Sequence, residues 1–494
     1  MSVKKNLQKI VQHTVAQFKN RTFSLIFINL VIITSQLLYI FLRFKYLNPT
    51  IPFWFTKNWG NHWLTPKVDI YFIPLISAGI FLFGLLLILL NRFYIKYIYE
   101  LIWSCVIFCN VFLSCALVNI IKSASVPFEP FINPLYVPLF IPFIIAFLFA
   151  YFILPYFIDY AHSKRLITNP QEHDHPAMIL ELPSARGGGF IFSLVFLIVS
   201  LFYVGISKEF LGLYISVLMI ASLGLIDDFQ NTHPLSSFKI VENPFLRLFL
   251  LFLAVTPTVS SGIIMDYISN PFDGVIVLSS IHPFLPAIFT TIWIVWVMNI
   301  LSWSNGVDGQ YCGIVGIASV VLALLALRFE PIEPIHMQVA ILAAISAGAA
   351  FGFAKYNWHP SKIMWGFGAI SAGLILSALS ISVRGKILTS VLIILVPFLD
   401  AIVTVVRRIV QGKSPFSGDR GHLHHLLLDR GWSVKKIARF YWLTTAFFGF
   451  LGVLFPERYS IQATLIIAGL VAFMIILLNL KSAKNKNQQL EAAK

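Results

Sequence analysis

The sequence predicts an all-α protein, a polytopic bundle of about fourteen helices that span a membrane. Of its 494 residues 58% are hydrophobic and 12% are charged, whereas a soluble domain carries about 25% charged residues. Apolar runs of about 20 residues recur along the chain, and each is long enough to cross a hydrocarbon core about 30 Å thick. Because unpaired backbone groups are costly in lipid, we expect these runs to be helical.

The apolar runs give the order of the spans along the chain. They are predicted near residues 24–43, 71–91, 98–121, 134–157, 189–206, 210–226, 245–262, 285–301, 310–327, 338–354, 366–382, 387–404, 440–456 and 461–480. The first three form an N-terminal membrane extension over 1–125, and about eleven form the main membrane domain over 126–482. Residues 483–494 form a polar cytoplasmic tail.

The net charge of +15 is explained by short loops between apolar spans, so it points to lipid headgroups rather than nucleic acid. With a cytoplasmic N-terminus, most Lys and Arg residues fall on the cytoplasmic side, as the positive-inside rule requires. Five polar loops then share that side, at 158–188, 227–244, 302–309, 355–365 and 405–439. We therefore predict a multi-pass protein of the cell membrane with a cytoplasmic active site.

Two adjacent carboxylates, Asp227 and Asp228, end one predicted span. They repel each other unless a cation neutralises them, and a Mg²⁺ ion that bridges substrate phosphates is one candidate. The alternative is a helix-end pair that faces water and forms salt bridges to Lys239 or Arg247.

A second polar segment runs from Asn299 to Gly309 and contains Asn305 and Asp308. The glycines beside Asp308 allow the backbone to approach a ligand, and the side-chain oxygens suit a metal or a sugar. The alternative is an ordinary Asn-Gly and Asp-Gly turn between two helices.

Two further loops suit anions. The loop from Arg407 to His425 gathers arginines and three histidines, and the guanidinium group matches phosphate oxygens. The segment from Arg186 to Gly189 places glycines at a helix start, where backbone N–H groups bind anions. The alternative for the first loop is an enrichment in cations that follows only from the positive-inside rule. The alternative for the glycine segment is a tight turn without a ligand.

Taken together and in order, these segments resemble the polyprenyl-phosphate N-acetylhexosamine-1-phosphate transferase family, over about residues 134–480. The resemblance is carried by a series of short motifs in the family's order. These are the glycine loop, Asp227-Asp228, Asn299 to Asp308-Gly309, Lys355-Tyr-Asn357 with Pro360, Pro397 to Asp400, Ser414-Pro-Phe, Asp419-Arg420 and His422-Leu-His424-His425.

The resemblance implies transfer of a sugar-1-phosphate from a UDP-sugar to polyprenyl (undecaprenyl) phosphate, with release of UMP, to initiate cell-envelope glycan synthesis. Mg²⁺, or Mn²⁺ instead, is the implied cofactor, and Asp227, Asp228 and Asp308 are its implied ligands. The same three aspartates and His424 are the implied catalytic residues. The implied substrate-binding residues are Arg186, Gly188, Asn299, Asn305, Asn357, Lys239, Arg420, His422 and His425.

The sequence departs from the family pattern at three positions. Asn305 stands where the family usually has aspartate, Ser302 where it has asparagine, and Gly366-Phe367 where a Gly-Asp pair is expected after Pro360. An inactive relative is therefore one alternative function, and a transporter or lipid flippase is another. A homodimer is an alternative to a monomer.

Overall fold

The computed structural model describes residues 25–53, 64–90, 96–124, 134–170, 182–233, 243–270, 274–328, 331–383, 391–414, 420–454 and 460–492. The chain divides into two compact units, Met1–Asn133 and Pro134–Lys494. Both units are built from helices, with three two-stranded sheets among the described residues. The predicted division at 125/126 lies in a stretch outside the described residues, so it stays a prediction.

The first unit contains three apolar helices and a short hairpin. A span covers Leu25–Tyr46, β1 (Thr50–Pro52) pairs antiparallel with β2 (Leu64–Pro66), and α2 (Phe72–Leu90) and α3 (Lys96–Ala124) follow. Inside this unit Asn110 Nδ2 donates a 3.0 Å hydrogen bond to Asn29 Oδ1. This hydrogen bond joins two buried amides that would be costly in hydrocarbon without a partner.

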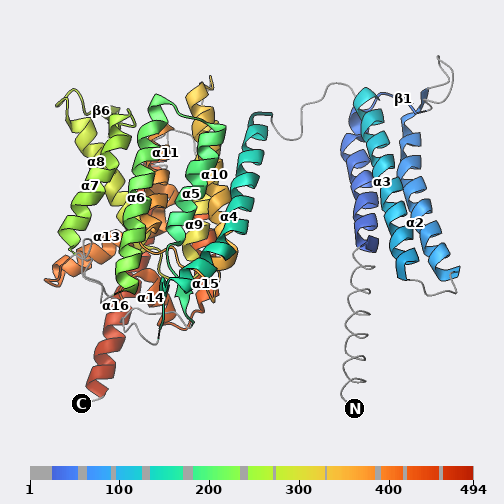
Figure 1. Ribbon diagram of the computed structural model, residues 1–494. Helices are drawn as coiled ribbons and strands as arrows, with labels where there is room; N and C mark the ends of the chain where they lie inside the picture. The colour runs from blue at the N-terminus through green and yellow to red at the C-terminus, as the bar shows by residue number, and fades with distance from the viewer. Residues whose placement is uncertain are drawn as a thin grey trace, which may run out of the picture. The chain divides into compact units, whose positions relative to one another are not determined.

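The second unit is a larger helical bundle. Its elements are η4 (Pro134–Tyr136), α4 (Val137–Ser163), β3 (Ile167–Thr168), β4 (Ser184–Ala185), α5 (Gly188–Tyr203), α6 (Lys208–Thr232), α7 (Pro244–Ser260), β5 (Tyr267–Ser269), β6 (Val275–Val277), α8 (Leu285–Trp303), α9 (Gln310–Ala326), α10 (Pro334–Asn357), α11 (Ala369–Ser382), α13 (Leu395–Val410), α14 (Leu423–Leu428), α15 (Val434–Leu454) and α16 (Ser460–Ala492). The hairpin of β5 and β6 lies at one end of this bundle and α14 at the other (Figure 1).

The helices confirm the predicted fold class. Among the described residues, eight helices are long and apolar enough to cross a membrane, and five shorter apolar helices accompany them. The predicted span at 387–404 differs, because the described helix there is α13 (Leu395–Val410). It carries Asp400, Arg407 and Arg408 and is not among the apolar helices.

Small residues allow the helices of the second unit to approach closely. A Cβ atom on Gly348 or Gly352 of α10 would lie 2.1 Å from the Phe143 carbonyl oxygen or 2.4 Å from that of Phe147, both on α4. The two backbones are therefore in direct contact, as small residues permit in membrane helix pairs. This contact fixes α10, whose C-terminal end leads into the candidate site.

Candidate active site

Asp228 lies near the C-terminal end of α6 and is fully buried. Its Oδ2 accepts a 3.1 Å hydrogen bond from the Gly187 backbone N–H, and its Oδ1 accepts one of 3.1 Å from Phe367 N–H. The Arg186 guanidinium also lies 3.4 Å from Oδ1. Because a buried carboxylate must be paired and hydrogen-bonded, Asp228 ties together α6, the glycine loop and the segment that carries Phe367.

The backbone N–H groups of the glycine loop donate hydrogen bonds to other parts of the protein. Gly188 N–H donates to the Met364 carbonyl (3.1 Å) and Gly189 N–H to that of Trp365 (2.9 Å). A Cβ atom on Gly188 would lie 2.4 Å from the Phe353 ring, so close packing accounts for this glycine. The predicted substrate-binding role of Gly188 stays a prediction, although its N–H is already bonded.

Asp227 differs from Asp228 in its partners. Arg247 of α7 forms a 2.9 Å ion pair with its Oδ1, and Asn231 Nδ2 donates to its Oδ2 at 2.7 Å. The Arg247 guanidinium also lies 4.8 Å from the centre of the Phe367 ring, a distance typical of cation–π contacts. Phe367, one of the departures from the family pattern, therefore positions the arginine that pairs with Asp227.

Asp308 lies in the turn between α8 and α9 and is partly exposed. Its Oδ2 lies 2.9 Å from His359 Nδ1 and accepts a 3.1 Å hydrogen bond from Ser361 N–H. Asn357 supports the same turn, because its Oδ1 accepts from Gly309 N–H at 3.2 Å. Asn357 is buried, and its predicted role in substrate binding stays a prediction.

The loop after α8 also contacts the histidine segment. A Cβ atom on Gly306 would lie 2.1 Å from His424 Nε2, so the His424 ring packs directly against the Gly306 backbone. Asn299 donates to the Val295 carbonyl within its own helix (2.7 Å). Asn305 is half-buried. The structure therefore brings Asp308, Asn305 and His424 into one neighbourhood.

The histidine segment is held by Asp400 of α13. Its Oδ2 lies 3.2 Å from His422 Nδ1, and its Oδ1 accepts a 2.8 Å hydrogen bond from Leu423 N–H. Trp303 of α8 lies near the His422 ring, with 6.4 Å between the ring centres. Asp400 belongs to one of the motifs in the sequence, but no role was predicted for it, because its distance from His422 along the chain does not indicate the contact.

Burial changes the titration of two histidines in α14, which lies outside the apolar spans. Burial, followed by the neighbouring histidines and Arg420, holds the pKa of His424 well below its usual value. Burial, followed by Arg420 and His422, lowers the pKa of His425 to about 4. In both rings Nδ1 is buried without a hydrogen-bond partner among the described residues. Both imidazoles are therefore neutral at pH 7.

One loop contacts both Asp308 and Asp228. Residues 358–368, between α10 and α11, supply His359 and Ser361 to Asp308 and Phe367 to Asp228. A Cβ atom on Gly366 would lie 2.0 Å from Asp228 Oδ2. Together with the contact between Gly306 and His424, this loop gathers the aspartates and the histidine segment at one end of the bundle.

Two predicted residues remain. Arg420 lies beside the histidine segment, where it adds to the effect of burial in lowering the pKa of His424 and His425, and it forms a 3.0 Å ion pair with Asp429. Lys239 lies outside the described residues. His359 was not predicted from the sequence, and Arg247 was considered only as a salt-bridge partner of Asp227 and Asp228. Among the described residues, no group of three or more His, Cys, Asp or Glu side chains lies close enough to hold a metal ion, so the predicted Mg²⁺ ligands stay a prediction.

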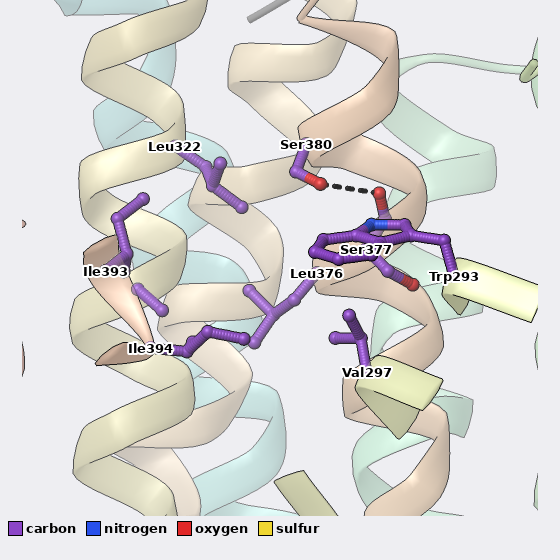
Figure 2. A pocket seen from close by; sticks show the side chains of 9 residues that line it. Trp293, Val297, Leu322, Leu376, Ser377, Ser380, Ile393 and Ile394 are labelled. Atoms are coloured by element: carbon purple, nitrogen blue, oxygen red, sulfur yellow. Dashed lines mark hydrogen bonds between the residues drawn. The ribbon is translucent and has the colours of Figure 1, made fainter. Parts of the chain in front are cut away.

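An apolar cavity lies in the same bundle, between α8, α9, α11 and residues 393–394. It is a narrow, partly open pocket. Figure 2 shows Trp293, Leu322 and Leu376 around it. Its polar lining residues are Ser377 and Ser380, and the Ser380 hydroxyl donates to the Ser377 carbonyl at 2.7 Å. The cavity therefore suits a hydrocarbon rather than a charged group.

Several curated proteins are similar to this chain. A decaprenyl-phosphate N-acetylglucosaminephosphotransferase of Mycolicibacterium smegmatis is 29% identical over 287 residues, 53% of this chain and 68% of that protein. A probable undecaprenyl-phosphate N-acetylglucosaminyl 1-phosphate transferase of Bacillus subtilis is 26% identical, over 46% of this chain and 63% of that protein. A phospho-N-acetylmuramoyl-pentapeptide-transferase of Orientia tsutsugamushi is 24% identical, over 61% of this chain and 87% of that protein.

With these relatives, the helical fold and the gathered site define a multi-pass membrane enzyme, a sugar-phosphate transferase. The model of glycosyl transferase family 4 matches residues 210–384 of this chain. That stretch runs from α6 to the end of α11 and includes the paired aspartates, Asp308 and the loop 358–368. The resemblance predicted from the sequence is thus confirmed.

Proposed function

We propose that this enzyme transfers a sugar-1-phosphate, N-acetylhexosamine-1-phosphate in the first instance, from a UDP-sugar to polyprenyl phosphate. The named relatives act on decaprenyl or undecaprenyl phosphate, which supports the acceptor. The products are UMP and a lipid-linked pyrophosphoryl sugar, the first intermediate of a cell-envelope glycan. We place the reaction at the cytoplasmic face of the cell membrane, because the basic loops and the site share one end of the bundle.

The observation that carries this proposal is the convergence of three distant segments. Asp228 and Asp308 are held at the two ends of loop 358–368, and His424 packs on Gly306, two residues before Asp308. Phosphoryl transfer depends mainly on in-line positioning and on neutralising charge. A set of acidic and basic side chains fixed by backbone contacts at one place suits both requirements.

The transfer itself needs little covalent help from the protein. An oxygen of the acceptor phosphate attacks the donor's β-phosphorus, the bond from that phosphorus to the bridging oxygen breaks, and UMP leaves with the electron pair. The acceptor is a phosphomonoester with a second pKa near 6, so it is mostly dianionic at pH 7 and requires no strong base. Arg186 and Arg247 lie where they can bind the phosphates once the substrates enter.

Mg²⁺ fits the chemistry of the donor set. This ion takes one or two carboxylates and completes its shell with substrate phosphates and water. Asp308 is the partly exposed carboxylate of the site, whereas Asp227 is buried and would have to exchange Arg247 or Asn231 for the ion. When bound, Mg²⁺ would neutralise the charge that develops on the phosphate oxygens. Asp228 is less suited, because its oxygens already accept two backbone hydrogen bonds.

The apolar lining of the narrow pocket between α8, α9 and α11 is compatible with a lipid acceptor beside these helices. Its lining is hydrocarbon apart from two serines, and α8 and α11 both lead toward the loops of the site. A polyprenyl chain that lies against these helices would present its phosphate to that end of the bundle.

The test is release of UMP by the purified enzyme in lipid nanodiscs. We expect UMP from one member of a panel of UDP-sugars, and only when polyprenyl phosphate and Mg²⁺ are both present. Asp308→Asn should lower the rate by about 100-fold or more, while Asp266→Asn, at the hairpin of β5 and β6, should leave it unchanged. A folded enzyme that releases no UMP with any donor would exclude this function.

A catalytically inactive relative is the second candidate. It is favoured by Asn305, an amide where the family usually has a carboxylate, and by Phe367, which occupies the place of an expected acid beneath Arg247. In that case the native chain is inert and Asn305→Asp gains UMP release. If the native chain is active and Asn305→Asp is no faster, this candidate is excluded.

A further inference from the structure

We infer that His359 is a positioning residue that fixes the orientation of the Asp308 carboxylate toward the reacting phosphates. The inference rests on the proposed function and adds a residue to it. His359 Nδ1 lies 2.9 Å from Asp308 Oδ2. Because an ionised carboxylate can only accept hydrogen bonds, the imidazole carries its proton on Nδ1 and donates it to Asp308.

The two donors that reach Asp308 select one of its oxygens. His359 Nδ1 and Ser361 N–H both bind Oδ2, at 2.9 and 3.1 Å, while Oδ1 accepts no hydrogen bond from the described residues. The carboxylate is therefore held in one rotational state with the second oxygen presented outward. A group that must face a ligand is commonly fixed in this way by hydrogen bonds behind it.

A contact made only for stability would look different. The side chains of His359 and Asp308 are 17% and 15% exposed, and an ion pair with access to water contributes little to folding. A stabilising pair would also gain from using both carboxylate oxygens, as Asp228 does with its two backbone donors. The one-sided arrangement at Asp308 favours orientation over stability.

His359 can hold this orientation because its own backbone is fixed. Lys362 N–H donates to the Tyr356 carbonyl (2.8 Å), and Ala185 N–H donates to the Lys362 carbonyl (3.1 Å). Met364 N–H returns a 2.8 Å bond to the Ala185 carbonyl. The loop that carries His359 is thus bound to the glycine loop beside Asp228, which sets Asp308 at a fixed place relative to that site.

The kinetic test compares His359→Leu with His359→Asn. Leucine removes the donor, while the asparagine amide nitrogen can take the place of Nδ1. We expect His359→Leu to lower kcat for UMP release by about 10- to 100-fold, with KM for the UDP-sugar within about threefold, and His359→Asn to recover most of kcat. His282→Leu, an exposed histidine in the loop after β6, is the matched control. Equal loss in His359→Leu and His359→Asn, or loss in neither, overturns the inference.

A second measurement does not depend on activity. The thermal unfolding midpoint is measured for the native enzyme, His359→Leu, Asp308→Asn and the double variant, which together isolate the coupling between the two side chains. Because the pair has access to water, we expect a small coupling, so that His359→Leu shifts the midpoint by nearly the same amount in the native and Asp308→Asn backgrounds. A large loss of stability that disappears in the Asp308→Asn background would mark a contact made for stability and overturn the inference, even if the native enzyme proves inert and the proposed function itself fails.

Discussion

Individual residues of the site are held by backbone groups as much as by charged side chains. Asp228 is enclosed by Gly187 N–H, Phe367 N–H and the Cα of Gly366, and Asp308 is bound by Ser361 N–H. Such contacts require small residues where the backbone approaches a carboxylate. Gly366 is the clearest case, because its φ of 63° also lies in the left-handed region, which favours glycine.

Replacing Gly366 by alanine should strongly destabilise the second unit. The new Cβ would lie 2.0 Å from Asp228 Oδ2, so the carboxylate or the loop must move. We expect a loss of several kcal/mol or failure to accumulate folded protein. The control is Gly205→Ala, which has a similar φ of 74° and no atom within 4 Å. Thermal unfolding in detergent measures both, and equal effects would contradict the steric argument.

His425 should make the enzyme less stable as the pH falls. Its pKa is lowered to about 4 in the folded protein by burial, Arg420 and His422, whereas an unfolded histidine titrates near pH 6.5. The unfolded state therefore binds a proton first as the pH falls from about 6.5 to about 4. The stability that the neutral ring contributes is present above pH 6.5 and is lost through that window.

The measurement is the unfolding midpoint at pH 7 and pH 5 for the native enzyme and for His425→Gln. We expect the native midpoint to fall, by an amount equivalent to about 1 kcal/mol from this residue, and the variant to lose less. His233→Gln, a partly exposed histidine at the end of α6, should keep the native pH dependence. A native midpoint that rises between pH 7 and pH 5 would refute the argument.

At the level of helices, the close contact between α4 and α10 fixes the position of α10, whose C-terminal end leads into the site. Gly352→Leu should separate the two helices, because even its Cβ would lie 2.4 Å from the Phe147 carbonyl oxygen. We expect a loss of about 2 kcal/mol or more. Gly469→Leu on α16, where nothing lies within 4 Å, should be neutral or slightly stabilising, since leucine is the better helix former. Unfolding midpoints that fall equally would show that close packing is not the cause.

Helices were largely predictable from hydropathy, because lipid imposes length and composition on each span. The predicted spans at 285–301 and 310–327 correspond to α8 at Leu285–Trp303 and α9 at Gln310–Ala326. The span predicted at 387–404 was less accurate. Its apolar residues suggested one helix, but Asp400, Arg407 and Arg408 lie on α13, where Asp400 turns toward the histidine segment.

Contacts between loops were less predictable than the helices. The polar motifs indicated that distant loops meet, and the structure places Asp228, Asp308 and His424 in one connected region. The partners of these residues could not be inferred, because His359 is 51 positions from Asp308 and the path of loop 358–368 decides which side chain reaches it. Likewise, an asparagine in a motif cannot be distinguished from one that supports a turn, as Asn357 does for Gly309.

In the second unit as a whole, the polar chemistry lies at one end of an apolar bundle. His422 begins α14, His424 of α14 packs against Gly306 beside Asp308, and loop 358–368 connects Asp308 with Asp228. The hairpin of β5 and β6 lies at the opposite end of the bundle from α14 (Figure 1). A membrane enzyme that joins a water-soluble donor to a lipid acceptor needs this arrangement, because the donor must enter from water on one side only.

This asymmetry predicts the sidedness of the second unit. In a background without the native cysteines, Ser280→Cys beside β6 should react with a membrane-impermeant maleimide added to intact cells. Lys435→Cys, at the start of α15 beside α14, should react only after the cells are opened, because we place that end in the cytoplasm. Both positions are exposed in the structure, so only the membrane can make one cysteine less accessible to the maleimide than the other. Labelling of both from outside would mean that the α14 end is not cytoplasmic, and a UDP-sugar supplied by the cell could not reach the aspartates.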